Sequence, residues 1–282
     1  MTNQDRVYGA LPWPRLTPDL LALVRTGTVY NLQHTLEAGI PIWAGHPPLQ
    51  IMAFLRHAET REYLVSPATA GTEYVSMGMH TGTHIDALCH IGRQQGDKFL
   101  LHGGVDAATA QDFRGFKELG IERMPPIITR LVLLDVAGRR GVAMLADSEE
   151  IGPDELRACA EAQDSPLSAG CAVAVRTGWE RIWKTENDRF GSRHPGIGLA
   201  AARYLVQQGC VVVGADTPTV EVLPAPDHVV HQFLLFESGV PLLENLCLSE
   251  LAADRCYESL LFVLPLKVRG ATASVVAPIA IT

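Results

Sequence analysis

The chain lacks the sequence features that mark several large classes of protein. It has no block of lysine and arginine, and its net charge is −8 over 282 residues, which argues against nucleic acid or an anionic membrane as a partner. No apolar run approaches the ~20 residues of a membrane-spanning helix, and residues 1–6 lack the basic-then-apolar pattern of a secretory signal. We therefore expect a cytoplasmic protein that binds a small molecule, with no nucleic acid and no membrane partner.

Several catalytic motifs are also absent. The sequence has no Gly-x-Ser-x-Gly, which disfavours a serine hydrolase of that type, and no Walker loop or Gly-x-Gly-x-x-Gly for a nucleotide. None of its six cysteines forms a Cys-x-x-Cys pair, so we expect reduced, mostly buried thiols. These cysteines are Cys89, Cys159, Cys171, Cys210, Cys247 and Cys256.

The composition is that of an ordinary globular protein, with 47% hydrophobic and 19% charged residues. Pro153 suits the first turn of a helix over 154–161, and Gly209 suits the position after a helix over 199–208. Strands and fewer helices together predict an α/β protein with a mixed sheet and flanking helices. Apolar runs typical of strands covered on both faces occupy residues 130–136, 172–177, 210–215, 260–268 and 273–281.

No linker, repeat or low-complexity segment divides the chain. Residues 1–25 are proline-rich and predict an N-terminal arm, and residues 26–282 predict a single domain. The segments 180–195 and 216–230 exceed normal connection lengths. We expect these two segments, together with residues 50–75, to line a pocket.

Residues 80–90 carry the strongest functional signal. Their sequence is His-Thr-Gly-Thr-His-Ile-Asp-Ala-Leu-Cys-His, and in an extended chain all the even-numbered side chains share one face. His84 and Asp86 would then have Cα atoms roughly 6–7 Å apart, suitable for sharing one ion. His80 and His84 would be roughly 13 Å apart, so joint ligation by both requires a bend near Gly82.

Imidazole and carboxylate donors together suit zinc, manganese or iron. Two or three protein ligands leave positions open for water and substrate, as in a catalytic site. Such a metal lowers the pKa of its water and polarises a carbonyl, which fits hydrolysis of an amide, lactone or ester. His231 and Glu244 could form a second cluster, or could be an ordinary histidine and a paired carboxylate. Trp43 could line an apolar pocket or pack in the core.

Taken together, these residues resemble the metal-dependent cyclase/kynurenine formamidase-like hydrolases, a family that includes isatin hydrolase. The signature is His80-x-Gly82-Thr83-His84-x-Asp86-x-x-x-His90. The likeness extends over nearly the whole chain, and Leu88, where many formamidases have proline, is typical of a longer subgroup. Further matching segments are Pro41–Gly45, Leu133–Val136, Val175–Trp179, Gly214–Thr217, His231–Asn245 and Leu264–Ala271.

The resemblance implies specific roles. His80, His84 and Asp86 would bind a first metal, and Asp86 would bridge to a second one held by His231 and Glu244. His90 would be the general acid/base, and Trp43 would line the substrate pocket. The implied fold is a swivelling β/β/α domain, and the implied assembly is a homodimer or homotetramer with the pocket near an interface.

Three functions remain to be compared. The first is a metal-dependent hydrolase, with one or two Zn²⁺ or Mn²⁺ ions per chain, that acts on a small cyclic or aromatic amide, lactone or ester. The second is a non-haem iron oxygenase, because two histidines and one aspartate can form a facial triad. The third is a non-enzymatic metal-binding protein, whose fold would melt on metal removal.

Overall fold

A curled nine-stranded mixed sheet forms the centre of the computed structural model, which describes residues 7–62, 64 and 67–282. Strands β12, β14, β16 and β17 run parallel, and antiparallel strands extend the sheet at both edges. In spatial order the strands are β19 (Ala273–Val275), β6 (His84–Asp86), β17 (Leu242–Glu244), β16 (Val212–Ala215), β14 (Ala172–Arg176), β12 (Ile127–Asp135), β18 (Glu258–Val263), β20 (Ile279–Ile281) and β3 (Val29–Asn31).

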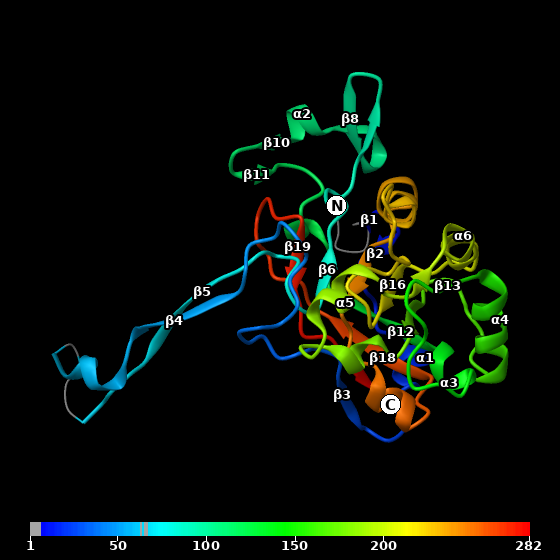
Figure 1. Ribbon diagram of the computed structural model, residues 1–282, viewed down its shortest axis with the longest axis horizontal. Coiled ribbons are helices and arrows are strands. Elements are labelled where there is room, and N and C mark those ends of the chain that lie inside the picture. The colour runs from blue at the N-terminus through cyan, green and yellow to red at the C-terminus, as the bar shows by residue number, and fades with distance from the viewer. Residues whose placement is uncertain (1–6, 63, 65–66) are drawn as a thin grey trace.

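The predicted α/β class with a mixed sheet and flanking helices is confirmed. The parallel strands β14 and β16 are mostly apolar and buried, as strands covered on both faces require, and helices α4 and α6 pack side by side next to the sheet (Figure 1). The α-helices are α1 (Pro18–Leu21), α2 (Ala107–Ala110), α3 (Val136–Arg139), α4 (Pro153–Ala162), α5 (Asn187–Ser192), α6 (Leu199–Gln207), α7 (Val229–His231) and α8 (Ser249–Ala253). Short 3₁₀ or π segments are η2 (His57–Glu62), η3 (His102–Gly104), η4 (Ile121–Arg123), η5 (Trp179–Ile182) and η6 (Gln232–Glu237).

Two predicted strands are wrong in extent, and proline explains both. The strand expected over 260–268 ends at Val263, and Pro265 follows it. The strand expected over 273–281 is two strands, β19 and β20, separated by a segment that contains Pro278. Proline cannot donate a hydrogen bond to a sheet.

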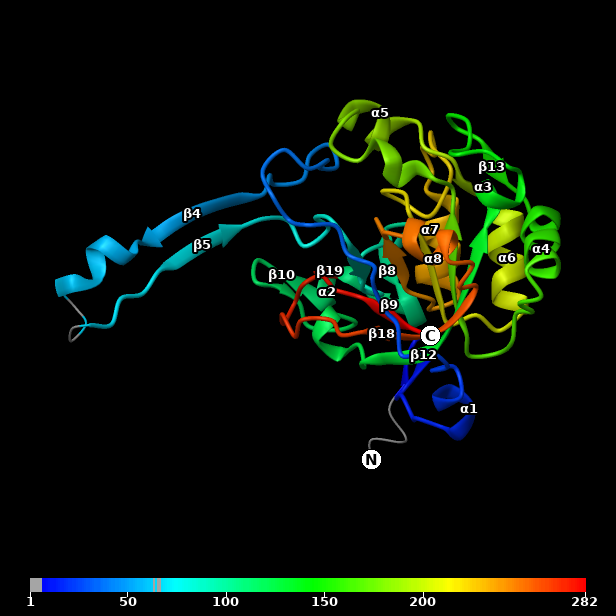
Figure 2. The same ribbon diagram turned by 90° about the horizontal axis from the view of Figure 1, so that it is seen from below.

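Some of the small sheets form projections from the body (Figure 1). The β4–β5 hairpin extends far from the rest of the molecule, and β7 to β11 form a second lobe with α2 (Figures 1 and 2). In the described residues, no helix is both long and apolar enough to span a membrane. The small sheets pair β1 (Val7–Tyr8) with β2 (Leu11–Pro12), β4 (Gln50–Leu55) with β5 (Thr72–Ser76), β7 (Arg93–Gln95) with β8 (Lys98–Leu101) and β9 (Val105–Asp106), β10 (Gln111–Asp112) with β11 (Gly115–Phe116), and β13 (Glu150–Ile151) with β15 (Gly196–Ile197).

Candidate metal centre

Strand β6 positions the first donors. It lies between β17 and β19, and its register places His84 directly opposite Glu244. Opposed residues of antiparallel strands point to the same face, so His84 Nε2 lies 3.2 Å from Glu244 Oε2. Asp86, two residues further on, is also on this face, with Oδ1 3.6 Å from His84 Nε2.

A sharp bend at Gly82 brings His80 to the same centre. Gly82 has a φ of +62°, and a Cβ there would lie 2.6 Å from Leu36 Cδ2. The bend expected from the spacing is therefore present, and His80 Nδ1 lies 2.8 Å from Asp86 Oδ1. The Gly82 carbonyl accepts hydrogen bonds from His84 Nδ1 at 2.9 Å and Asn245 Nδ2 at 3.0 Å, which leaves His84 Nε2 free to bind a metal.

The prediction of one extended segment over residues 80–90 is wrong. Only His84–Asp86 is strand. A turn follows, in which the His90 backbone N–H donates to Ala87 O at 2.9 Å. This turn carries His90 back towards the centre, with Nε2 4.0 Å from Asp86 Oδ2. Leu88, expected on the face of the donors, packs in the hydrophobic core instead.

His231 reaches the centre from the helical segment α7. Its Nε2 lies 3.3 Å from Glu244 Oε1, and its Nδ1 lies 2.5 Å from Glu221 Oε1. Glu221 also contacts His228 Nδ1 at 3.0 Å and accepts a hydrogen bond from Val230 N at 3.1 Å. A carboxylate on the second imidazole nitrogen is typical of metal-ligating histidines. Sequence reasoning missed Glu221; the signal available was a carboxylate within the long segment 216–230.

These side chains form three overlapping groups of three donors, and in each group the donor atoms lie within 4.8 Å of one another. Two of the groups share Asp86, and the third consists of Glu221, His228 and His231. Asp86 is fully buried, and among the described residues its oxygens have imidazole neighbours but no backbone N–H or hydroxyl donor. A buried carboxylate is costly unless a cation compensates it, so this donor set fits a divalent metal. The two groups that share Asp86 are His80, His84 and Asp86, and Asp86, His231 and Glu244.

The pKa values follow from burial and from the neighbouring charges. For Asp86, burial favours the neutral form, but His90, His80 and His84 outweigh it and the pKa lies far below its ordinary value. For His231, burial disfavours the cation, but Glu221 and Glu244 outweigh burial and raise the pKa to about 10. For His90, burial dominates and lowers the pKa to about 3, so this imidazole is neutral near pH 7.

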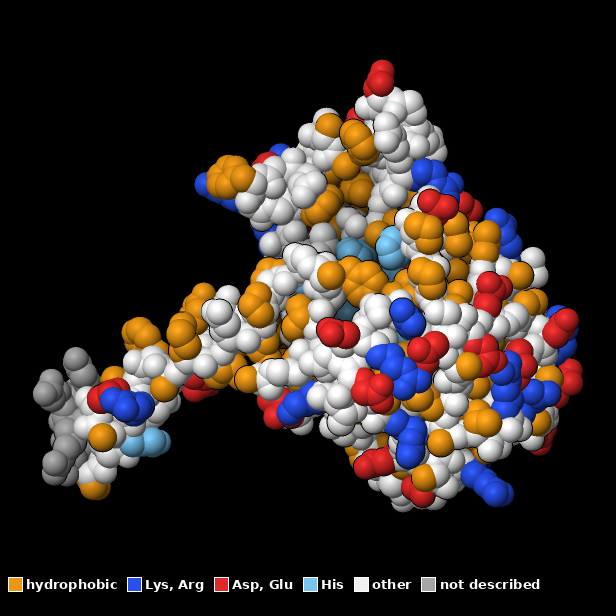
Figure 3. Space-filling model, in the orientation of Figure 1, with side chains coloured by type: hydrophobic (Ala, Val, Ile, Leu, Met, Phe, Trp, Pro, Cys, Tyr) orange, Lys and Arg blue, Asp and Glu red, His pale blue; other side chains and the backbone are white. Residues whose placement is uncertain are grey.

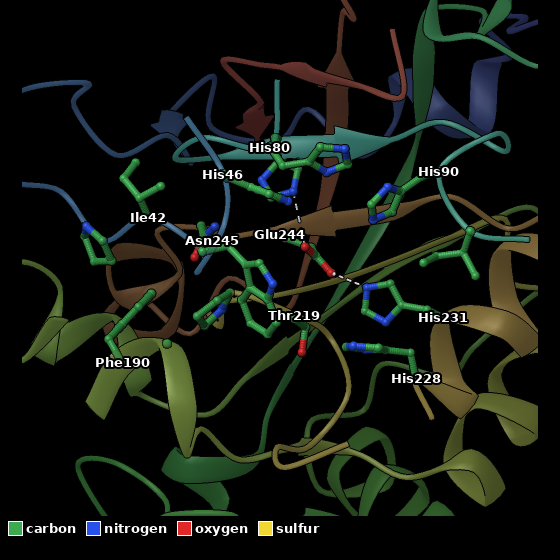
Figure 4. A pocket seen from close by; sticks show the side chains of 16 residues that line it. Ile42, His46, His80, His90, Phe190, Thr219, His228, His231, Glu244 and Asn245 are labelled. Atoms are coloured by element: carbon green, nitrogen blue, oxygen red, sulfur yellow. Dashed lines mark ion pairs between the residues drawn. The ribbon is translucent and has the colours of Figure 1, made fainter. Parts of the chain in front are cut away.

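The donors open into a cavity of about 160 Å³. Figure 4 shows His90, His231 and His228 on one side of it, facing Ile42 and Phe190. Trp43 also lines it, with its ring 6.3 Å from that of His228. Residues of the segments 180–195 and 216–230 form walls, as expected. The prediction for 50–75 is wrong, since the described residues of that segment form the projecting hairpin and line no part of this cavity.

Comparisons with known proteins agree with this architecture. A kynurenine formamidase of Geobacillus thermodenitrificans (strain NG80-2) is 25% identical over 239 residues, covering 84% of this chain and 90% of that protein. A crystal structure described as a novel cyclase superposes with a TM-score of 0.86 at 26% identity, covering 95% of this chain and 92% of that one. An isatin hydrolase bound to the product analogue thioisatinate shares the fold, with a TM-score of 0.67, 21% identity, and coverage of 89% and 91%.

Fold, donor set and relatives together define a hydrolase with a mixed α/β sheet and a histidine–carboxylate centre. Residues 30–222 match the model of the cyclase family, described as "Putative cyclase". The chain belongs to this cyclase family, as its motif suggested.

Proposed function

We propose that the protein is a metal-dependent hydrolase that cleaves a C–N or C–O bond at the carbonyl of a small cyclic or aromatic amide, lactone or ester. The observation that carries this proposal is Asp86, a fully buried carboxylate that contacts imidazoles and lies at the junction of two groups of metal-binding side chains. The family membership and the formamidase relatives support an amide as the bond cleaved.

The residues that would hold the metal follow from the geometry. His80, His84 and Asp86 would hold one Zn²⁺ or Mn²⁺ ion, and Asp86, with His231 and Glu244, would hold a second. Imidazole and carboxylate donors suit both metals. When bound, such an ion would lower the pKa of a water molecule and polarise the substrate carbonyl.

His90 is positioned to move the proton. It lines the cavity beside the donors, its imidazole is neutral near pH 7, and Asp86 lies close enough to stabilise the imidazolium that forms. His90 would accept a proton from the attacking water and then donate it to the leaving nitrogen or oxygen. An oxygenase would not need this group, so His90 favours hydrolysis over iron-dependent oxygenation.

The far wall of the cavity favours a flat, apolar substrate. Ile42 and Phe190 contribute apolar surface opposite the imidazoles (Figure 4), and Trp43 also lines the cavity. Pockets of this kind bind the apolar body of a ligand and orient its polar group towards a few fixed side chains. A cyclic or aromatic acyl compound would place its carbonyl at the donors and its ring against this wall.

Metal analysis combined with a substrate panel tests the proposal. We expect the purified protein to contain a divalent ion, to lose turnover with a chelator, and to regain it with Zn²⁺ or Mn²⁺ on at least one cyclic or aryl amide, lactone or ester. Turnover under anaerobic conditions excludes the oxygenase. A protein that binds neither ion and hydrolyses none of the compounds would contradict the proposal. A fold that melts on chelation, with no turnover when reloaded, would favour the metal-binding protein without activity.

A further inference from the structure

A second cluster of metal-binding side chains lies outside the cavity just described. His34 follows strand β3, Glu180 lies in η5, and Cys247 lies between β17 and α8. One donor atom from each lies within 4.8 Å of the other two. None of the three lines the catalytic cavity; they line a separate pocket of about 380 Å³, together with Ser249 and Glu250.

The imidazole of His34 is fixed in place and incompletely paired. Its ring stacks on Trp183, with 4.1 Å between ring centroids and 8° between planes, and its backbone N–H donates to Thr83 Oγ1 at 3.0 Å. Its Nε2 is buried and has no hydrogen-bond partner among the described residues. Burial also lowers the pKa of His34 to about 4, so the ring is neutral near pH 7 and presents a lone pair.

Positive charge compensates Glu180 and Cys247 only weakly, since Arg176 lowers the pKa of Glu180 from a distance and Arg181 lines the same pocket. Glu180 Oε2 accepts a hydrogen bond from Leu248 N at 2.6 Å, but in the described part of the chain no lysine or arginine forms an ion pair with this carboxylate. Burial, followed by the charge of Asp216, raises the pKa of Glu180 to about 7. Burial, followed by the charge of Glu180, raises the pKa of the Cys247 thiol to about 12. A cation would favour the charged forms of both groups.

We propose that His34, Glu180 and Cys247 form a second, non-catalytic metal site that binds Zn²⁺. Thiolate, imidazole and carboxylate are the donors that zinc takes in proteins. One thiolate and one carboxylate neutralise the two positive charges of the ion, and the thiol proton leaves to solvent. A water molecule or the carboxylate of Glu250, which lines the same pocket, would complete four-coordination.

This site would join three segments that are distant in the sequence. His34 belongs to the chain that leaves the edge strand β3, Glu180 to the turn after β14, and Cys247 to the chain between β17 and α8. Asn245, two residues before Cys247, holds the Gly82 carbonyl at the catalytic centre. Zinc at the second site would therefore restrain a segment that supports the first site, and it would do so without contacting the substrate.

Titration with Co²⁺ tests this site on the full-length protein, because the catalytic donors are nitrogen and oxygen only. A bound thiolate gives cobalt an intense near-ultraviolet charge-transfer absorption that those donors cannot produce. We expect the band in the unaltered protein and in Cys256→Ser, a matched control whose cysteine is also partly exposed but contacts Tyr30 instead. We expect Cys247→Ser to abolish the band.

Two further variants keep the thiol and make the result decisive. His34→Gln and Glu180→Gln should weaken Co²⁺ binding, read from the same band, by about 100-fold or more, since even residues that only orient a ligand cost about 10–100-fold in affinity. His84→Ala should keep the band while losing the catalytic metal, which separates this site from the proposed function. The absence of the band in the unaltered protein, its persistence in Cys247→Ser, or unchanged affinity in both glutamine variants would overturn the proposal.

Discussion

The imidazoles of the catalytic centre differ in what their second ring nitrogen contacts. His84 Nδ1 lies 2.9 Å from the Gly82 carbonyl, His231 Nδ1 lies 2.5 Å from Glu221, and His80 Nε2 lies 2.9 Å from Thr272 Oγ1. Each contact orients its ring and leaves the other nitrogen facing the carboxylates. His90 Nε2 is 4.0 Å from Asp86, beyond hydrogen-bond distance. These orientations support the proposal that three of the histidines are ligands and that His90 moves protons.

This difference predicts opposite effects for two alanine variants. His84→Ala should lose both bound metal and turnover. His90→Ala should keep its metal and lose about 10²–10⁴-fold in kcat, the usual contribution of general acid–base catalysis. Metal content by mass spectrometry and steady-state rates on the same preparations measure both effects. Loss of metal from His90→Ala would show that His90 is a ligand instead.

Glu221 should act through His231. Glu221→Gln keeps the size of the side chain but removes the charge that orients the imidazole, so metal affinity should fall by about 10–100-fold. Glu237→Gln is the matched control, because Glu237 pairs with Arg93 on the surface. Competition with a chromophoric chelator measures both variants. Equal affinities in the two variants would mean that Glu221 does not position His231.

Metal binding should release protons. Before a cation binds, burial disfavours protonated His231, but Glu221 and Glu244 raise its pKa to about 10, so this imidazole carries a proton near pH 7. A metal ion must displace that proton. Affinity should therefore increase as the pH rises towards about 10 and decrease in acid. Calorimetry in buffers of different ionisation enthalpy counts the released protons, and a buffer-independent heat would contradict this expectation.

At the scale of single elements, the centre depends on the bend before β6. Gly82 has positive φ and lies against Leu36. These two constraints exclude a side chain at this position and bring His80 onto the face that carries His84 and Asp86. The strand itself is only three residues long, so the bend and the following turn decide where His80 and His90 lie.

Gly82→Ala should be more destabilising than an ordinary glycine substitution. The left-handed backbone costs an alanine about 1–2 kcal/mol, and the contact with Leu36 adds about 1–3 kcal/mol of overpacking. Gly141→Ala is the control, because Gly141 has a φ of +69° and a methyl group added there would meet no atom within 4 Å. Urea unfolding compares the two free energies. Equal losses would show that Leu36 moves aside at no cost.

The sequence predicted the strands of the sheet better than the backbone conformation of residues 80–90. Long apolar runs specify β12 and β14 because both faces of these strands are buried. Alternation alone could not show that the extended segment ends after Asp86, because that end is set by tertiary contacts. One such contact is the hydrogen bond from Leu88 N to Tyr8 Oη at 2.9 Å.

At the scale of the whole molecule, the β4–β5 hairpin is the most unusual feature. It projects from the body with apolar side chains along its length (Figure 3), including Phe54, Met52 and Tyr74, which are 80%, 55% and 54% exposed. An isolated two-stranded hairpin is marginally stable in water, and exposed apolar patches mark interaction sites. We expect a second copy of this chain to cover it, which agrees with the predicted homodimer or homotetramer.

Charge on the hairpin should therefore weaken assembly. The double substitution Met52→Lys and Phe54→Lys should shift the protein towards monomer, because two cations cannot be buried against an apolar partner surface. Val142→Lys is the control, at a valine that is 44% exposed in the loop after α3. Sedimentation velocity at matched concentrations measures the change. An unaltered protein that is already monomeric, or a double variant that assembles like the control, would contradict this expectation.

The sequence by itself determined the donor types, the bend at Gly82 and the α/β class. Metal-binding residue types, a glycine and apolar runs are local features of the sequence, so they can be recognised without knowing the fold. Only the tertiary structure decided how distant carboxylates contact the histidines. Glu244 faces His84 through strand register, Glu221 reaches His231 through a loop, and Glu180 meets His34 and Cys247 across three segments. No local sequence pattern encodes these contacts, because they depend on how β6, β17 and the loops pack against one another.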